Sequence, residues 1–501
     1  MNISYNFDRN TKVLTLSGKG EMWSGKLSKP GSNKFSTEVE TVVIESGITS
    51  IGSNAFEGFA NLKEVHIPNT VTYIGQSAFS RCGFTEIYIP SSVTAVGANA
   101  FSSSSLMYAT VPSSKIGDSA FAKCANLISV KFTATNVQLG REALAYCDKL
   151  ENVIFANGVQ TIPEGFLRGC DALKGFTVPQ GVTSVGSSAF AECTALVYVD
   201  LPDSVTSFGE AVFEKCCALE AVALPNQLTT IPKETFAYCR SLKRVYFPSA
   251  LTQIGPRAFT DCTALSAVKI PEGVTKIDTS AFDSCSSLQW VSFPSTLTVI
   301  ADCSFKNTGL KSVVLPDSVT QLGKQAFGFC KNLESVKLST SMSSTGESSF
   351  KSCSSLTYLT LPANITTISD ASFELCSGLI YVHCQGAFPR IERAAFNVQG
   401  AGPVTLYYND GTDGWSGHSD LSLKSANVTL HRWDREPDSL PTLPIFEEPA
   451  VTPPAKPPVA TRVAGVPSSA SIRFAIPSSI AAAPITKPER IQSTVLVPIT
   501  E

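Results

Sequence analysis

Cysteine is the residue whose type and spacing in this chain most directly indicate possible chemistry. The chain has 15 cysteines among 501 residues. Eleven of them recur three residues after a phenylalanine or its equivalent: Cys82, Cys124, Cys147, Cys193, Cys216, Cys239, Cys262, Cys285, Cys330, Cys353 and Cys376. Cys170 is displaced from this column by one residue, and Cys217, Cys303 and Cys384 lie outside it. Such a column is either a set of reactive thiols or a structural part of a repeat.

The spacing favours the structural interpretation. Zinc sites need four converging ligands, commonly supplied by close pairs such as C-x-x-C, and the sequence contains no such pair. Side chains at equivalent positions of stacked repeats point the same way, which disfavours disulfides between them even though their Cα atoms are close enough. We therefore predict a buried ladder of small apolar thiols, with no metal site. Occasional disulfides and a metal or redox role remain the alternatives.

Other catalytic arrangements are poorly represented. The four histidines are His66, His383, His418 and His431, and the first two stand many repeats apart. No G-x-S-x-G nucleophile elbow, P-loop or dinucleotide-binding fingerprint occurs. The sequence therefore predicts a protein that is not an enzyme and has no cofactor.

The elements that position the cysteines form a repeat of about 23 residues. Sixteen units follow one another, marked by Phe56, Phe79, Phe101, Phe121, Leu144, Phe166, Phe190, Phe213, Phe236, Phe259, Phe282, Phe305, Phe327, Phe350, Phe373 and Phe396. A step this constant is the signature of a solenoid, in which each unit buries its apolar face against its neighbours.

Each part of the unit has a structural interpretation. The segment LKEVHIP (62–68) alternates like a half-buried strand, with Val65 and Ile67 inward, Glu64 and His66 outward, and Pro68 ending the ladder. A second apolar pair, at positions 71 and 74, returns to the core, and Gly75 is expected to permit a turn. The next residues, SAFSRC (77–82), are expected to form a helical or 3₁₀ turn.

Repeats such as VTSVGSSAFAECTALVYVDLP (182–202) and VTKIDTSAFDSCSSLQWVSFP (274–294) resemble those of the BspA-like leucine-rich repeat family. The resemblance covers roughly residues 3–400. It implies an α/β leucine-rich-repeat solenoid of about 16 repeats with a parallel strand face. It also implies a bacterial or protozoan surface protein of the adhesin or surface-antigen type, which binds host proteins.

The solenoid needs caps, because an end unit otherwise exposes its core. We predict an N-terminal β cap at 1–40, containing the strand VLTLSG (13–18), the solenoid at 41–400, and a C-terminal β cap at 401–434. Residues 435–501 hold 13 of the 30 prolines and no cysteine. They are predicted to be a disordered, proline-rich tail, with a ligand for a Pro-recognising domain or a tether as the alternative.

Composition excludes several classes of partner. The net charge is −3 and only 16% of residues are charged, with Lys and Arg scattered singly, so no nucleic-acid partner is expected. No window approaches the roughly 18 apolar residues of a membrane helix, and the first residues do not look like a secretory signal.

The outward strand positions are where the repeat dictates no residue type. Aromatic residues and Arg often dominate binding energy at protein interfaces. The candidate ligand-binding face is therefore Tyr198, Asp200, Arg244, Tyr246, Lys269 and Trp290. Aromatic residues that simply suit exposed strands are the competing interpretation. The predicted function is binding of a protein ligand, such as a host extracellular-matrix protein, at the cell surface or outside the cell. The alternative is a cytoplasmic scaffold that uses both the solenoid and the proline-rich tail.

Overall fold

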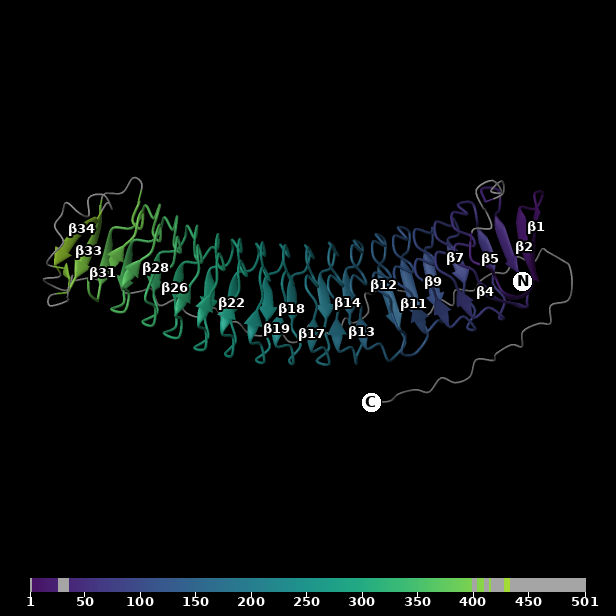
Figure 1. Ribbon diagram of the computed structural model, residues 1–501, viewed down its shortest axis with the longest axis horizontal. Coiled ribbons are helices and arrows are strands. Elements are labelled where there is room, and N and C mark those ends of the chain that lie inside the picture. The colour runs from purple at the N-terminus through teal and green to yellow at the C-terminus, as the bar shows by residue number, and fades with distance from the viewer. Residues whose placement is uncertain (1, 26–35, 399–402, 410–413, 416–427, 433–501) are drawn as a thin grey trace, which may run out of the picture. The chain divides into compact units, whose positions relative to one another are not determined.

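The computed structural model describes residues 2–25, 36–398, 403–409, 414–415 and 428–432. The chain divides into units 1–451 and 452–501, and all the described residues belong to the first. They form a solenoid in which most turns of the chain contribute one strand to each of two parallel ladders, so that consecutive turns stack in sequence order (Figure 1). The predicted solenoid of about 16 turns is confirmed.

The first ladder carries the V-x-I strands. Its members are β3 (Thr41–Ile44), β5 (Glu64–His66), β7 (Glu86–Tyr88), β9 (Tyr108–Val111), β11 (Ser129–Phe132), β12 (Asn152–Phe155), β14 (Gly175–Thr177), β16 (Tyr198–Asp200), β18 (Ala221–Ala223), β20 (Arg244–Tyr246), β22 (Ala267–Lys269), β24 (Trp290–Ser292), β26 (Ser312–Val314), β28 (Ser335–Lys337), β29 (Tyr358–Leu361), β31 (Tyr381–Cys384), β33 (Val404–Tyr408) and β34 (Val428–Arg432). Paired strands are parallel, and each residue pairs with the equivalent residue of the neighbouring repeat, as in Glu86↔Tyr108 and Tyr358↔Tyr381. We call the outward side of this ladder the strand face.

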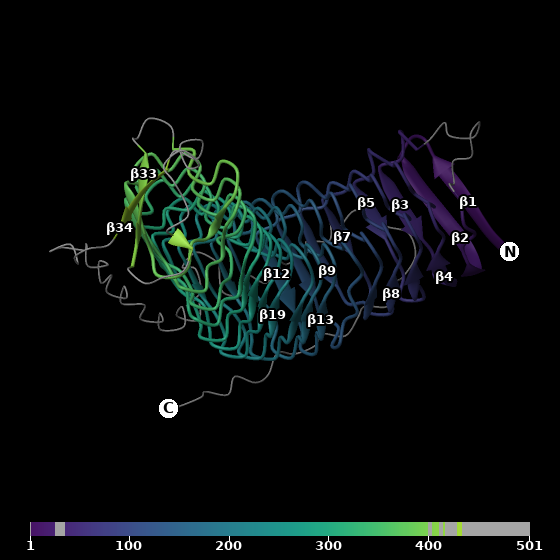
Figure 2. The same cartoon turned by 60° about the vertical axis from the view of Figure 1, so that its left-hand side comes forward.

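The second ladder lies on the other side of the core and is built from shorter strands. Its members are β4 (Ile48–Ile51), β6 (Tyr73–Ile74), β8 (Ala95–Val96), β10 (Lys115–Ile116), β13 (Thr161–Ile162), β15 (Ser184–Val185), β17 (Ser207–Phe208), β19 (Thr230–Ile231), β21 (Gln253–Ile254), β23 (Lys276–Ile277), β25 (Val299–Ile300), β27 (Gln321–Leu322), β30 (Thr367–Ile368) and β32 (Arg390–Ile391). The two ladders enclose one continuous apolar core, around which the successive turns wind (Figure 2).

The alternation expected along each repeat is present. Val65 and Ile67 are buried, whereas Glu64 and His66 are exposed. Gly75 is required for a different reason from the one expected. Its φ is not positive, but a Cβ there would lie 2.6 Å from the backbone nitrogen of Ser53 in the preceding turn. Glycine therefore allows two turns of the solenoid to approach each other closely.

The segment expected to be helical is instead a third hydrogen-bonded ladder, and the described residues contain no α-helix. In the turn around Phe79, Ser77 and Arg81 have φ of 53° and 58°, the left-handed region. This alternation turns every second N–H toward the next turn of the solenoid: Phe79 donates to the carbonyl of Ala100 over 2.7 Å. A helix would keep these N–H groups within its own turn. The same two positions, on either side of the central residue, have positive φ in every turn from Asn54 to Leu375.

This backbone pattern corrects one repeat marker. The positive-φ residues of the sixth turn are Gly165 and Gly169, and Leu167 donates its N–H to the carbonyl of Ala189. Leu167, not Phe166, therefore occupies the central position, and Phe166 takes the place of the usual alanine. Cys170 is consequently in register, three residues after the central residue, and is not displaced.

The central phenylalanines stack on one another through the core. Wherever two of them are neighbours, ring centroids lie 5.0 to 5.6 Å apart and ring planes are within 11° of parallel. Separations above the 4.8 Å strand spacing mean that the rings are offset, which their quadrupoles favour. Leu144 and Leu167 interrupt the stack, and Phe132 and Phe155 bring aromatic volume into the core from the strands nearby, with their rings 5.4 Å apart.

Both ends of the solenoid continue its hydrogen bonding. β1 (Asn2–Asp8) pairs antiparallel with β2 (Val13–Glu21), and β2 pairs in parallel with both β3 and β4. At the other end, β33 and β34 extend the first ladder in parallel beyond the last repeat. The predicted proline-rich tail at 435–501 lies outside the described residues.

We predict that Phe259→Ala lowers the free energy of unfolding by about 3–5 kcal/mol, because it removes a fully buried ring that stacks on two others. Phe259→Leu is expected to cost clearly less, since leucine fills this position in two turns. Urea unfolding followed by circular dichroism measures both, with the exposed Tyr88→Ala as the control. Equal losses in the alanine variant and the control would contradict the importance of the stack.

Candidate functional site

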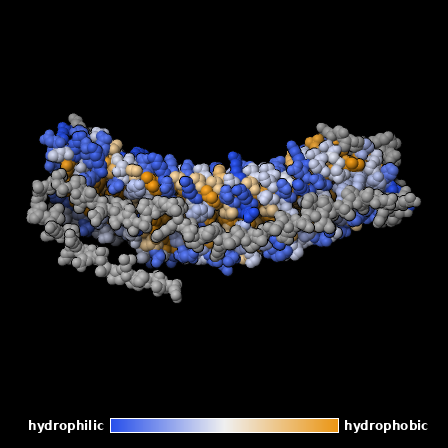
Figure 3. Space-filling model, turned by 180° about the vertical axis from the view of Figure 1, so that it is seen from behind, coloured by the Kyte–Doolittle hydropathy of each residue, from blue (hydrophilic) through white to orange (hydrophobic). Residues whose placement is uncertain are grey.

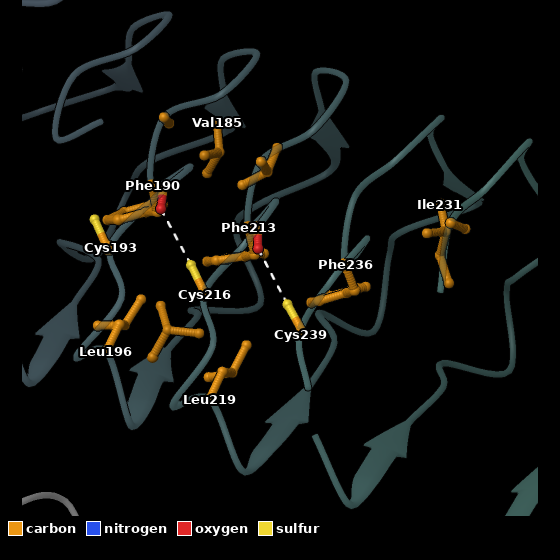
Figure 4. Close-up of a cluster of buried hydrophobic side chains, with 14 of the residues drawn as sticks. Val185, Phe190, Cys193, Leu196, Phe213, Cys216, Leu219, Ile231, Phe236 and Cys239 are labelled. Atoms are coloured by element: carbon orange, nitrogen blue, oxygen red, sulfur yellow. Dashed lines mark hydrogen bonds between the residues drawn. The ribbon is translucent and has the colours of Figure 1, made fainter. Parts of the chain in front are cut away.

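The cysteine column is a buried ladder in which each thiol bonds to the preceding turn. Cys216 Sγ lies 3.1 Å from the carbonyl oxygen of Phe190, and Cys239 Sγ lies 3.1 Å from that of Phe213 (Figure 4). The same contact to the preceding central residue recurs along the column at 3.0–3.3 Å, and it includes Cys170. All 15 cysteines are free in this structure and those of the column are buried, which confirms the predicted thiol ladder.

Hydroxyl side chains occupy the column in two turns. Ser104 and Thr308 are buried, and their hydroxyls lie 3.4 Å and 3.1 Å from the thiols of Cys124 and Cys330 in the following turns. Cysteine, serine and threonine share a small side chain that can donate one hydrogen bond. The position therefore selects a compact donor for a carbonyl that the turn leaves buried, and it does not require sulfur.

Burial makes these thiols chemically inert. Desolvation raises the pKa of Cys82 and Cys193 to about 12 and that of Cys124 to about 11. The thiolate is the reactive form, so a raised pKa together with burial suppresses oxidation and metal binding. Among the described residues, no group of three or more His, Cys, Asp or Glu side chains is placed to hold a metal ion.

The chemically varied part of the molecule is the strand face, where outward residues of successive strands form two rows. Across strands β16 to β24 the first row is Tyr198, Ala221, Arg244, Ala267 and Trp290. The second row is Asp200, Ala223, Tyr246, Lys269 and Ser292. Arg244, Tyr246, Lys269 and Trp290 thus come together on three consecutive strands, whereas Tyr198 and Asp200 lie beyond the alanines of β18.

Large and small residues alternate along the first row, and the ring of Tyr198 lies across a small neighbour. A Cβ on Gly175 would lie 2.1 Å from Cζ of Tyr198, so that ring covers the glycine of β14. Tyr198, Tyr246 and Trp290 are all half-buried. The hydroxyl of Tyr246 is itself buried and has no hydrogen-bond partner in the described part of the chain.

Arg244 has the opposite environment. Ala221 pairs with it on one side and Ala267 lies on the other, so that no long side chain flanks it in its row. Arg244 and Lys269 are exposed, and Asp200 is two strands away from Arg244. The centre of this face therefore presents two cations above a floor of half-buried aromatic rings and alanines.

The sequence did not single out a second aromatic group, at the C-terminal end of the strand face. Tyr358 and Tyr381 stack with centroids 5.9 Å apart, Tyr407 meets Tyr381 edge-on at 5.9 Å, and His431 lies 5.7 Å from Tyr407. These four residues, which we call the tyrosine row, come from β29, β31, β33 and β34, and they pass from the first row of outward positions (Tyr358 and Tyr381) to the second (Tyr407 and His431). Tyr407 and His431 belong to the predicted C-terminal cap. They lie beside the repeat residues because β33 and β34 continue the first ladder.

The remaining surface is mixed. Figure 3 shows small groups of apolar residues interspersed with hydrophilic ones on the side of the described solenoid that faces the viewer. In the described part of the chain, no helix is long and apolar enough to cross a membrane.

Three features define a leucine-rich repeat solenoid: two parallel strand ladders, turns that approach each other closely at glycine, and a pattern of buried apolar residues that recurs in each repeat. The family model for the BspA type leucine rich repeat region (6 copies) matches residues 31–151, 108–219, 160–289 and 275–400. The chain belongs to this family. The family and the fold are those of leucine-rich repeat proteins, and neither indicates a catalytic activity.

Several solved structures are similar to this chain, and the first of those given below shows the same fold. A leucine-rich repeat protein from Bacteroides ovatus is 24% identical, with a TM-score of 0.55, covering 72% of this chain and 94% of its own. One from Eubacterium ventriosum is 23% identical, with a TM-score of 0.43, covering 62% and 93%. A leucine rich cell surface protein from Faecalibacterium prausnitzii is 22% identical, with a TM-score of 0.38, covering 84% and 95%. No curated protein matches the chain.

We predict that only Cys217 and Cys303, which are partly exposed, react with a thiol reagent in the native protein near neutral pH. All 15 cysteines should react in concentrated guanidinium chloride. Counting the thiolate released from Ellman's reagent measures both states. The Cys217→Ser/Cys303→Ser variant is the control and should show no native reaction. Fast native labelling of several further thiols would contradict the buried ladder.

We also predict that stability falls with rising pH above pH 9. Burial raises the pKa of Cys193 to about 12 in the folded protein, above the ordinary thiol value of 9.0, so the stabilisation is complete below pH 9 and is lost as pH rises toward the folded pKa. Each such thiol contributes a slope of about 1.4 kcal/mol per pH unit. Urea midpoints across this range measure the slope. A Cys193→Ser/Cys216→Ser/Cys239→Ser variant should have a shallower slope, and an identical slope would refute the assignment.

Proposed function

We propose that this protein is a non-enzymatic binding solenoid that engages a protein ligand through the centre of its strand face, at the cell surface. The binding residues are Tyr198, Asp200, Arg244, Tyr246, Lys269 and Trp290. The observation that carries the proposal is the arrangement around Arg244, where an exposed guanidinium stands between two alanines. A partner's carboxylate can reach it without displacing a neighbouring side chain.

The half-buried rings support the same proposal. Half-buried Tyr and Trp rings have less rotamer freedom than fully exposed ones, so less conformational entropy remains to be lost on binding. The ring faces present apolar area beside two cations, a combination that is enriched at protein interfaces. Because the core uses only the inward residues of each strand, the outward rows are free to vary with the ligand.

A surface location is compatible with the many free thiols. Unpaired cysteines ordinarily favour a reducing compartment. Here the ladder thiols are buried, and desolvation raises the pKa of thiols such as that of Cys193, so an oxidising environment does not reach them. The ladder cysteines are therefore compatible with the surface location that the family resemblance suggests, and a host extracellular-matrix protein is the proposed class of ligand.

The test is capture of ligands by the full chain from purified matrix proteins and, in parallel, from cell lysate. We expect capture from the matrix set, and Arg244→Ala/Trp290→Ala should weaken it at least tenfold, the effect of losing about 1.4 kcal/mol. The control is Tyr73→Ala/Arg141→Ala, which changes exposed residues away from the strand face. Unchanged binding by a folded double variant would overturn the assignment of the face. Capture from lysate alone would favour the cytoplasmic scaffold.

A further inference from the structure

The tyrosine row has features of a docking surface for an extended chain. Its four rings come from four consecutive strands, and each ring contacts the next. At about 4.8 Å between strands, the row runs roughly 14 Å across the sheet. Rows of aromatic rings bind polyproline II helices, which advance about 3.1 Å per residue, so about five residues of such a helix cover the row.

The charge around the tyrosine row limits which kind of segment can dock there. The outward residues of β28 to β34 include Lys337, His383 and His431, and among the described residues of these strands none that points outward is acidic. His383 is held in place by a 3.1 Å hydrogen bond between its Nε2 and Oδ1 of Asn409. The surface therefore favours an anionic partner that is rich in proline.

A segment of the chain itself has this composition. Residues 434–449 read DREPDSLPTLPIFEEP, with four prolines. They carry five carboxylates and one arginine, which gives a net charge of −4. The segment begins two residues after Arg432, the last residue of β34. Fully extended, 16 residues reach about 50 Å, several times the length of the row.

We propose that residues 434–449 dock in cis across the tyrosine row, with their prolines on the rings and their carboxylates toward Lys337. A tether this short gives an effective concentration on the order of 1 mM. A contact with a dissociation constant of about 0.1 mM would then be occupied about nine-tenths of the time. The inference is independent of the proposed ligand site, which lies on other strands.

The opposite end of the strand face provides a matched comparison. Tyr88 and Tyr108 are exposed on adjacent strands there, but Glu64 and Glu86 lie beside them. Glu64 and Glu86 outweigh Lys131 there, whereas no acidic residue offsets Lys337, so an acidic segment is bound less well at this end although the aromatic area is similar. Thr110 lies next to Tyr88 in register, just as Thr360 lies next to His383, so the two threonines occupy equivalent positions at the two ends.

The test uses full-length chains carrying the photo-crosslinker p-benzoylphenylalanine, either as Thr360→p-benzoylphenylalanine or as Thr110→p-benzoylphenylalanine. After irradiation of the monomer, we expect the first to link to the tryptic peptide 436–462, and the second to do so at least fivefold less. Glu447→Lys/Glu448→Lys should reduce the link from position 360 severalfold, as should Tyr358→Ser/Tyr381→Ser. Circular dichroism confirms that each variant is folded.

A mixture of isotope-labelled and unlabelled chains identifies the source of the peptide. Links within one chain support docking in cis. Links between labelled and unlabelled chains would overturn it in favour of a second copy as the occupant. No link to this peptide from position 360, or equal yields from the two positions, would overturn the proposal altogether.

Discussion

The structure depends on one constraint: every turn must repeat at the hydrogen-bond spacing of its neighbours. Three ladders enforce it, the two of strands and the one formed by the turn around each central residue. In that turn, residues such as Ser77 and Arg81 adopt left-handed backbone conformations that cost of order 1 kcal/mol or more each. The cost is offset because the N–H groups of these two residues and of the central residue between them donate hydrogen bonds to the next turn of the solenoid. Lateral bonding therefore takes precedence over local propensity throughout the chain.

The same constraint explains why core positions are uniform and outward positions are not. A side chain that projects inward always meets its own equivalent one spacing away, so a ring stacks on a ring and a thiol meets the carbonyl of the preceding turn. Packing at that fixed distance tolerates few residue types. An outward side chain meets only solvent and its two row neighbours. Alanine beside Arg244 and glycine beside Tyr198 are choices that the core does not impose.

Much of the fold could be predicted from the sequence because a period is a global signal. Alternation in LKEVHIP placed Val65 inward correctly, and the step between central residues predicted the solenoid. The register of the sixth turn could not be read locally, since Phe166 and Leu167 are both large and apolar and only the backbone hydrogen bonds separate them. The conformation of SAFSRC (77–82) was predicted wrongly for a related reason. Its composition is compatible with a helix, but hydrogen bonds to the next turn of the solenoid determine its backbone conformation. The tyrosine row was missed because its third and fourth rings lie beyond the repeat, where the period had ended.

The cysteine ladder links local unfolding of the solenoid to the oxidation state of its thiols. Each thiol is shielded by its own turn and by the one before it, so a turn that detaches uncovers its sulfur. In oxidising surroundings an uncovered thiol can be oxidised before the turn closes, and the altered side chain no longer fits its buried position. Fraying from an end would then become permanent one turn at a time, and the pattern of oxidised cysteines along the chain would show how far it had progressed.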